Sequence, residues 1–277
     1  MLIRTMEQLE ADGRVMSISH GKATAVRLLT KSDRLGFSLS EARASQAGQS
    51  DLWYKHHWEA NYVRSGKAVL ENRSTGERWP LEPGVLYCVG PKDRHRIIRE
   101  EPSDMRIISI FNPPIEGEET HDEDGAYPPT GDVPPCKERM FVKSIEAVQK
   151  AGMERTIAGG AAVLTHYLTV DDNLGFSFVA VRLKAGREAD LWYKHHWEAN
   201  LVLAGTLEVT DYATGDVHNM RHGGMYLIGP KDRHHVKALT DVHIVTVFNP
   251  PLTGKEVHDE DGSYPPTGSI PAGPTDT

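Results

Sequence analysis

Cysteine, long apolar runs and excess positive charge are all scarce in this 277-residue chain. Its two cysteines, Cys88 and Cys136, form no C-x-x-C pair, so a disulfide framework or a thiolate metal site has no support. The longest apolar stretches, such as 107–111 and 244–248, are far shorter than the roughly 20 residues that a membrane-spanning helix needs. We therefore expect neither a disulfide scaffold nor a membrane protein.

The charge balance is acidic, with 31 basic and 39 acidic residues and a formal net charge of −8. Such a chain has no net positive field to attract phosphates, so nucleic-acid binding is disfavoured. Near the start, Glu7 and Glu10 interrupt the region where a secretory signal needs an apolar core. We expect a cytoplasmic protein whose partner is a small molecule.

The chain is a tandem duplication. The block DLWYKHHWEAN at 51–61 recurs unchanged at 190–200, a shift of 139 residues. FNPP at 111–114 recurs at 248–251, so one repeat has lost two residues in a loop. Because this period is too long for a solenoid unit, each repeat is expected to be a domain. We predict domains at 1–139 and 140–277, joined through the proline-rich stretch Tyr127–Pro135.

The repeats are predicted to be all-β. In the second repeat, short apolar-alternating runs at 200–203 and 206–210 flank Ala204-Gly205, and a turn at 213–216 follows, which indicates successive hairpins. Helical periodicity is limited to 6–12 and 140–151. Many short strands of this spacing favour a β-barrel or a double-sheet jelly roll.

Spacing alone suggests a metal site. Strand alternation places His57 and Glu59 on one face, and His95 follows after two glycine turns. This order resembles the two metal motifs of cupins. The match is partial, because the positions expected for a first histidine pair hold Trp53, Tyr54 and Lys55. Taken from spacing, the set His57, Glu59 and His95 would suit iron(II).

Longer blocks resemble a particular family, the ectoine synthases, which are single-domain cupins. The blocks are WYKHHWEA at 53–60, LYCVGPKDRH at 86–95, FNPPIEGEETHDEDGAYP at 111–128 and FNPPLTGKEVHDEDGSYP at 248–265. The resemblance spans both repeats. It implies two tandem cupin barrels that form an intramolecular pseudo-dimer, and it leaves further homodimerisation open. It also implies a hydro-lyase that closes N-γ-acetyl-diaminobutyrate, or an analogue, into a cyclic amidine with loss of water.

The resemblance also implies site residues, and its metal set differs from the one that spacing suggests. Fe(2+), or another divalent metal in its place, would be held by a glutamate, a tyrosine and a histidine in each repeat: Glu59, Tyr87 and His95, then Glu198, Tyr226 and His234. We adopt this set, which leaves His57 and His196 next to the ligands. The implied catalytic residues are Tyr54, Glu119, His121, Tyr193, Glu256 and His258. The implied substrate-binding residues are Arg27, Phe111 and Phe248.

The repeats differ at one implied contact. Arg27, expected to meet a substrate carboxylate, corresponds to His166, and the family's nearby tryptophan is replaced by Ala23 and Ala162. Since a guanidinium is a permanent, forked cation, we expect the first repeat to bind an acidic substrate better. Two other hypotheses stay open from the sequence, namely an iron(II) cupin oxygenase and a non-catalytic small-molecule-binding cupin.

Overall fold

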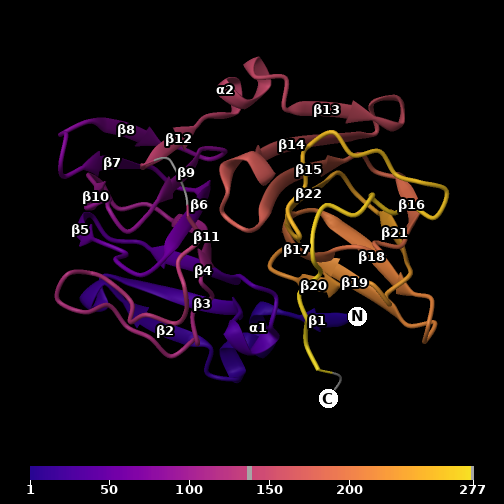
Figure 1. The fold of residues 1–277 in the computed structure, drawn as a ribbon, viewed down its shortest axis with the longest axis horizontal. Coiled ribbons are helices and arrows are strands. Elements are labelled where there is room, and N and C mark those ends of the chain that lie inside the picture. The colour runs from indigo at the N-terminus through magenta and orange to yellow at the C-terminus, as the bar shows by residue number, and fades with distance from the viewer. Residues whose placement is uncertain (136–138, 276–277) are drawn as a thin grey trace. The chain divides into compact units, whose positions relative to one another are not determined.

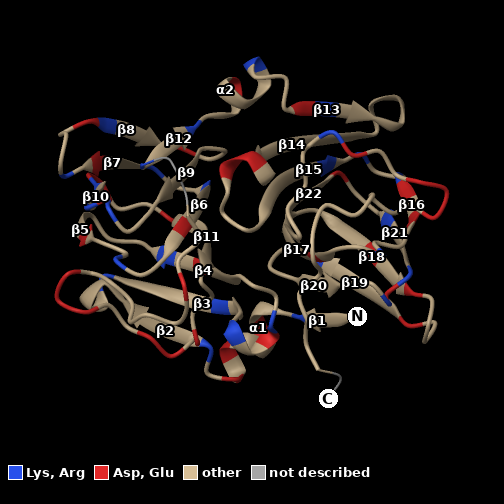
Figure 2. Ribbon diagram, viewed as in Figure 1, with Lys and Arg blue, Asp and Glu red and all other residues tan. Residues whose placement is uncertain are grey.

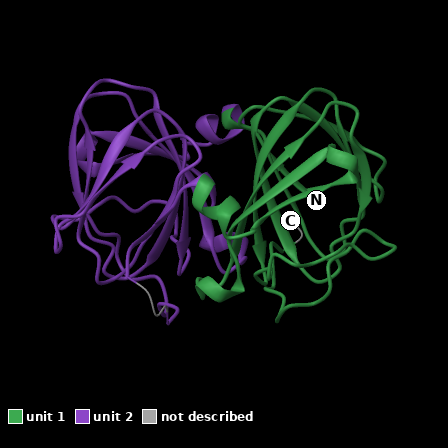
Figure 3. Cartoon of the chain, turned by 90° about the horizontal axis from the view of Figure 1, so that it is seen from above, with its two compact units in different colours: residues 1–6, 146–277 green, residues 7–145 purple. Residues whose placement is uncertain are grey.

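A computed structural model of the chain describes residues 1–135 and 139–275. Its contacts divide the chain into two compact units (Figure 3). Residues 7–145 (purple) are called the first barrel here, and residues 1–6 with 146–277 (green) are called the second barrel. Cys136 lies outside the described residues, while Cys88 is buried.

The first barrel is built from a seven-stranded and a four-stranded sheet, both antiparallel (Figure 1). The large sheet runs in the order β12 (Phe141–Lys143), β9 (Leu86–Val89), β6 (Trp58–Ser65), β11 (Met105–Asn112), β4 (Ser38–Ala44), β3 (Ala23–Leu29) and β2 (Val15–Ile18). The small sheet runs in the order β5 (Gly48–Leu52), β10 (His95–Arg99), β7 (Ala68–Asn72) and β8 (Arg78–Leu81).

The second barrel repeats this arrangement. Its large sheet runs β1 (Leu2–Arg4), β20 (Met225–Ile228), β17 (Trp197–Ala204), β22 (Val242–Asn249), β15 (Ser177–Leu183), β14 (Ala162–Leu168) and β13 (Glu154–Ile157). Its small sheet runs β16 (Glu188–Leu191), β21 (His234–Ala238), β18 (Thr206–Asp211) and β19 (Val217–Arg221). These two double-sheet barrels agree with the all-β fold expected from the sequence.

The opening strand of each repeat lies in the sheet of the other repeat. β1 pairs with β20 so that Ile3 lies opposite Tyr226, and β12 pairs with β9 so that Val142 lies opposite Tyr87. The unit boundaries therefore fall at residues 6/7 and 145/146, whereas the sequence repeats meet at 139/140. Each added strand covers the edge of the strand that carries a site tyrosine.

Helices are short. α1 (Met6–Ala11) and α2 (Ile145–Lys150) have six residues each, within the two stretches where the sequence shows helical periodicity. Within residues 1–135 and 139–275, the other helical elements are four 3-10 turns: η1 (Ser19–Gly21), η2 (Lys31–Asp33), η3 (Ala158–Gly160) and η4 (Val170–Asp172). In the described part of the chain, no helix has the length and hydrophobicity to span a bilayer.

One predicted hairpin is wrong. The turn at 213–216 does join paired strands, β18 and β19. Ala204-Gly205, in contrast, carries the chain from the large sheet to the small one, because β17 and β18 lie in different sheets. Gly205 has a φ of +81°, and a Cβ there would lie 2.1 Å from the carbonyl oxygen of Asp241. Alternation could not reveal this crossing, since both strands bury one face in the same barrel.

The core of each barrel lies between its two sheets. In the first barrel, Leu70 and Leu81 of the small sheet pack in one cluster with Val63 and Val89 of the large sheet. Charged residues of both signs are interspersed on the strands and loops of both units (Figure 2). The alternation of buried and partly exposed residues in β10 and β18 places one face of each strand towards the interior.

Candidate active sites in the two barrels

Two of the implied metal ligands of the first barrel lie on neighbouring strands. Glu59 on β6 is paired with Val89, and Tyr87 on β9 is paired with Asn61. Because Asn61 follows Glu59 by two residues, Glu59 and Tyr87 are diagonal neighbours on one face of the sheet. Both side chains are buried, with 5% and 2% of their surface exposed.

The third implied ligand, His95, begins β10 in the small sheet and is fully buried. Its Nδ1 lies 3.2 Å from the backbone carbonyl of Asp93. Only an N–H can donate to a carbonyl, so Nδ1 carries the proton and Nε2 keeps its lone pair. Nε2 is buried without a hydrogen-bond partner among the described residues. A buried histidine nitrogen left in this state is suited to binding a metal.

Burial controls the ionisation of these groups. It raises the pKa of Glu59 to about 7, against the smaller opposing effects of Asn61 and Ser109. Burial, together with the nearby Glu59, also raises the pKa of Tyr87 well above its usual value, and burial lowers the pKa of His95 to about 4. All three groups are therefore driven to their neutral forms, and a cation between them would reverse the shifts of Glu59 and Tyr87.

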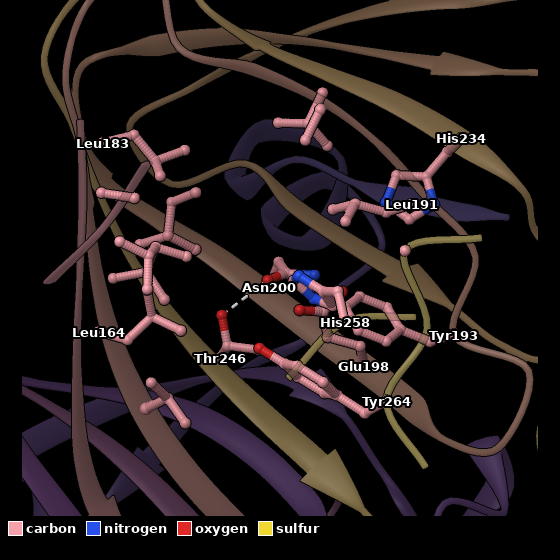
Figure 4. A pocket seen from close by; sticks show the side chains of 18 of the residues that line it. Leu164, Leu183, Leu191, Tyr193, Glu198, Asn200, His234, Thr246, His258 and Tyr264 are labelled. Atoms are coloured by element: carbon pink, nitrogen blue, oxygen red, sulfur yellow. Dashed lines mark hydrogen bonds between the residues drawn. The ribbon is translucent and has the colours of Figure 1, made fainter. Parts of the chain in front are cut away.

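The second barrel brings its equivalents together around one cavity of about 320 Å³. Glu198, Tyr226 and His234 all line it, and Figure 4 shows Glu198 and His234. Burial raises the pKa of Glu198 to about 8. His234 repeats the arrangement of His95, with Nδ1 3.1 Å from the carbonyl of Asp232 and Nε2 buried without a partner in the described chain.

In the first barrel, the equivalent residues line different cavities. Glu59 lines an inner cavity of about 70 Å³, whereas His95 lines a separate cleft of about 400 Å³. Tyr87 lines neither of them. In the part of the chain that the structure describes, no group of three or more His, Cys, Asp or Glu side chains is placed to hold a metal.

A tyrosine and a histidine form a hydrogen-bonded pair beside each glutamate. The Tyr54 hydroxyl lies 2.9 Å from His121 Nε2, and the backbone N–H of Ser19 donates to His121 Nδ1 at 2.9 Å. Since Nδ1 accepts, the neutral ring carries its proton on Nε2 and donates it to Tyr54. The hydroxyl proton of Tyr54 is then free to point at a ligand. Tyr193 and His258 repeat the pair at 3.0 Å.

Sequence reasoning missed a third tyrosine in each site. Tyr127 stacks on His121 with ring centroids 4.5 Å apart, and Tyr264 stacks on His258 at 4.3 Å. Both are buried. The sequence did contain a signal for these two tyrosines, because in both repeats a single residue separates the tyrosine from the repeated HDEDG motif. The implied aromatic Phe111 also contacts Tyr54 edge-on, as Phe248 contacts Tyr193.

Arg27 is held inside the first barrel with 2% of its surface exposed. Its three hydrogen bonds go to neutral oxygens, namely the hydroxyl of Ser40 at 3.3 Å, the carbonyl of Glu119 at 3.1 Å and the hydroxyl of Tyr127 at 3.1 Å. These contacts fix the guanidinium beside the inner cavity, which Arg27 lines. The arrangement is suited to receiving an anionic group.

His166 replaces this cation in the second barrel. It lines the cavity with 4% of its surface exposed, and neither ring nitrogen has a hydrogen-bond partner within the described residues. Burial lowers its pKa to about 4, so it is neutral near pH 7. A guanidinium from another strand, that of Arg155, donates to the carbonyl of Glu256 at 2.6 Å. The described residues that line the cavity include His166 but not Arg155.

The implied catalytic residue Glu119 is not among the residues that line the inner cavity of the first barrel. Its carboxylate accepts the backbone N–H groups of Glu116 and Gly117. Glu256 accepts those of Thr253 and Gly254 in the same way. Burial acts to raise the pKa of Glu256, but these amide contacts lower it overall. Both carboxylates thus organise the loop that leads to the site histidine.

His57 and His196 contact the closing loops. His57 Nε2 lies 3.1 Å from the hydroxyl of Thr130, and His196 Nε2 lies 3.1 Å from that of Thr267. Both histidines are fully buried. Their Nδ1 atoms have no partner among the described residues.

Comparison of folds defines the class. An oxalate decarboxylase from Lactobacillus farciminis is similar with a TM-score of 0.64 at 12% identity, covering 91% of this chain and 87% of the other. The salicylate 1,2-dioxygenase from Pseudoaminobacter salicylatoxidans is similar with a TM-score of 0.62 at 11% identity, covering 90% and 82%. At these identities the likeness shows the fold alone. The protein is a cupin with two barrels in one chain.

Comparison of sequences defines the family. The family model described as ectoine synthase matches twice, at residues 1–131 and 140–268. The L-ectoine synthase of Sphingopyxis alaskensis is 44% identical over 126 residues, which are 46% of this chain and 90% of the relative. That of Oceanobacillus iheyensis is 42% identical over 126 residues, or 46% and 97%. The chain belongs to the ectoine synthase family. It is an ectoine synthase-like cyclodehydratase, a carbon–oxygen lyase.

Proposed function

We propose that each barrel converts an N-acylated diamino acid, with N-γ-acetyl-2,4-diaminobutyrate as the reference substrate, into a cyclic amidine and water. The observation that carries this proposal is the double constellation of a buried glutamate, tyrosine and histidine beside a Tyr–His pair. In the reaction, the free amine attacks the amide carbonyl carbon. The carbonyl oxygen leaves as water with the two amine protons.

We further propose that Fe(2+) is held by Glu59, Tyr87 and His95, and equally by Glu198, Tyr226 and His234. The fit rests on two observations. His95 and His234 each leave a buried Nε2 lone pair without a partner in the described chain. Burial raises the pKa of Glu59 to about 7 and that of Glu198 to about 8, so a bound cation would favour their ionised forms. A bound ferrous ion supplies Lewis acidity that polarises the amide carbonyl of the substrate.

The chain's own residues orient the substrate and move its protons. In this proposal, Tyr54 donates its hydroxyl proton to the departing oxygen, which is supported by the bond that His121 donates to the Tyr54 oxygen. Arg27 holds the substrate carboxylate at the inner end of the first cavity. Phe111 and Phe248 form apolar walls that limit water near the reacting amide.

The test is anaerobic iron reconstitution followed by mass spectrometry of products from N-γ-acetyl-diaminobutyrate. We expect loss of one water per turnover and up to two irons per chain. Glu59→Gln should remove one iron and Glu198→Gln the other, since an anionic ligand is lost from a three-ligand set. Iron-loaded protein that forms no cyclised product would refute the reaction, and the absence of any bound metal would refute both sites.

The same experiment separates the alternatives. A cupin oxygenase would consume oxygen stoichiometrically with substrate, whereas the proposed reaction runs under anaerobic conditions. A binding protein would bind the substrate without forming product.

A further inference from the structure

The lining of the second cavity is apolar at positions where the first is small or polar. Leu164, Val179, Val181 and Leu183 line the second cavity. The equivalent residues of the first barrel, 139 positions earlier, are Ala25, Ser40, Ala42 and Ala44. Exchange of Ser40 for valine also removes the hydroxyl that accepts from Arg27 in the first barrel. The wall therefore gains larger hydrocarbon side chains and loses one hydroxyl.

Two buried arginines of the first cavity are replaced by uncharged residues in the second barrel. His166 replaces Arg27, and Ala238 replaces Arg99, another buried arginine that lines the first cavity. Among the described residues that line the second cavity, Arg187 is the one arginine or lysine, and it lies next to the exposed Glu188. The guanidinium that bonds the Glu256 carbonyl, that of Arg155, is not among the lining residues, so a carboxylate in this cavity lacks the contact that Arg27 offers in the first.

The two ends of the second cavity differ in chemistry. Figure 4 shows Leu164 and Leu183 on one side and Glu198, Tyr193 and His258 on the other. The volume of about 320 Å³ is within the range for small-molecule sites. The buried, unpartnered nitrogens of His166 leave one neutral hydrogen-bonding position along the wall.

We propose that the second barrel binds N-acyl diamines whose acyl chain is several carbons longer than acetyl, with the chain against Leu164, Val181 and Leu183. This inference rests on the proposed function, because it places the substrate amide at Glu198, Tyr226 and His234. A carboxylate on the diamine is not required for binding there. The first barrel remains the site for the short, anionic substrate.

The test is isothermal titration calorimetry of the full chain with N-γ-acyl-2,4-diaminobutyrates from acetyl to hexanoyl. For one of two sites per chain, affinity should rise by about fourfold for each added methylene. The decarboxylated ligand N-hexanoyl-1,3-diaminopropane should bind that site within about twofold of its carboxylated counterpart. Affinity that stays level or falls with chain length would overturn the inference.

Matched variants locate the site. Val181→Asp places a carboxylic acid in the apolar wall and should abolish the chain-length gain, while Ala42→Asp at the equivalent position of the first barrel should preserve it. An equal loss in both variants would contradict the assignment to the second barrel. If Val181→Asp does not fold, the ligand series on the unmodified chain still tests whether affinity rises with acyl-chain length. Calorimetry of the iron-free chain measures binding without turnover. Tight binding of long acyl ligands there, with no product from the iron-loaded chain, would count against the proposed reaction alone.

Discussion

Arg27 is the side chain whose replacement tests most directly how the first barrel recognises a substrate. The change is Arg27→His, which copies the residue at position 166, in a His234→Ala background that silences the second barrel. A charge-assisted hydrogen bond to a carboxylate contributes about 1.5–3 kcal/mol. Its loss should therefore raise the KM for N-γ-acetyl-diaminobutyrate by about tenfold to a hundredfold.

The control for this prediction is a substrate without the carboxylate. Arg27 also supports the Tyr127 hydroxyl and the Glu119 carbonyl, so its replacement disturbs the site for any ligand. Initial rates with N-acetyl-1,3-diaminopropane measure that general loss. The ratio of the two kcat/KM values isolates the carboxylate contact, and Arg27→Lys should fall between wild type and Arg27→His. An unchanged ratio in Arg27→His would refute the proposed contact.

Three further predictions concern asymmetry, pH and backbone geometry. His95→Ala should remove most turnover of the acidic substrate and His234→Ala little, and equal losses in initial rate would refute the asymmetry. The pKa of His166 is lowered to about 4 from 6.5, so the stability contributed by its neutral form is present above pH 6.5 and lost as the pH falls towards 4. In urea titrations, the free energy of unfolding should decrease between pH 7 and pH 4 by up to about 3 kcal/mol less in His166→Gln than in the wild type. The same decrease in both proteins would contradict this prediction. Gly205→Ala should destabilise the fold by about 2 kcal/mol more than Gly215→Ala, because both glycines have a φ of +81° but only a Cβ at Gly205 meets another atom within 4 Å. Equal urea midpoints of these two variants would show that the contact at Gly205 relaxes freely.

The repeated blocks were enough to predict the fold and the family. A duplication with a period of 139 residues, short alternating strands and the HDEDG motif sufficed to predict two β-barrels of the ectoine synthase type, and both are confirmed. The roles given to Glu59, Tyr87, His95 and their equivalents stay predictions. Spacing alone favoured His57 over Tyr87, because tyrosine is an uncommon ligand and local patterns do not reveal diagonal neighbours on paired strands.

The sequence by itself determined which residue types each repeat carries, including the exchange of Arg27 for His166. Only the tertiary structure decided what surrounds them. Several features depend on segments distant in sequence: the strand exchange, the crossing at Gly205, the contact of Ser19 with His121, and the bond from Arg155 to the carbonyl of Glu256. Side-chain alternation and motif spacing are local properties, whereas cavity size and ionisation depend on every segment that packs around a group. For that reason two barrels with the same motif enclose cavities of different chemistry.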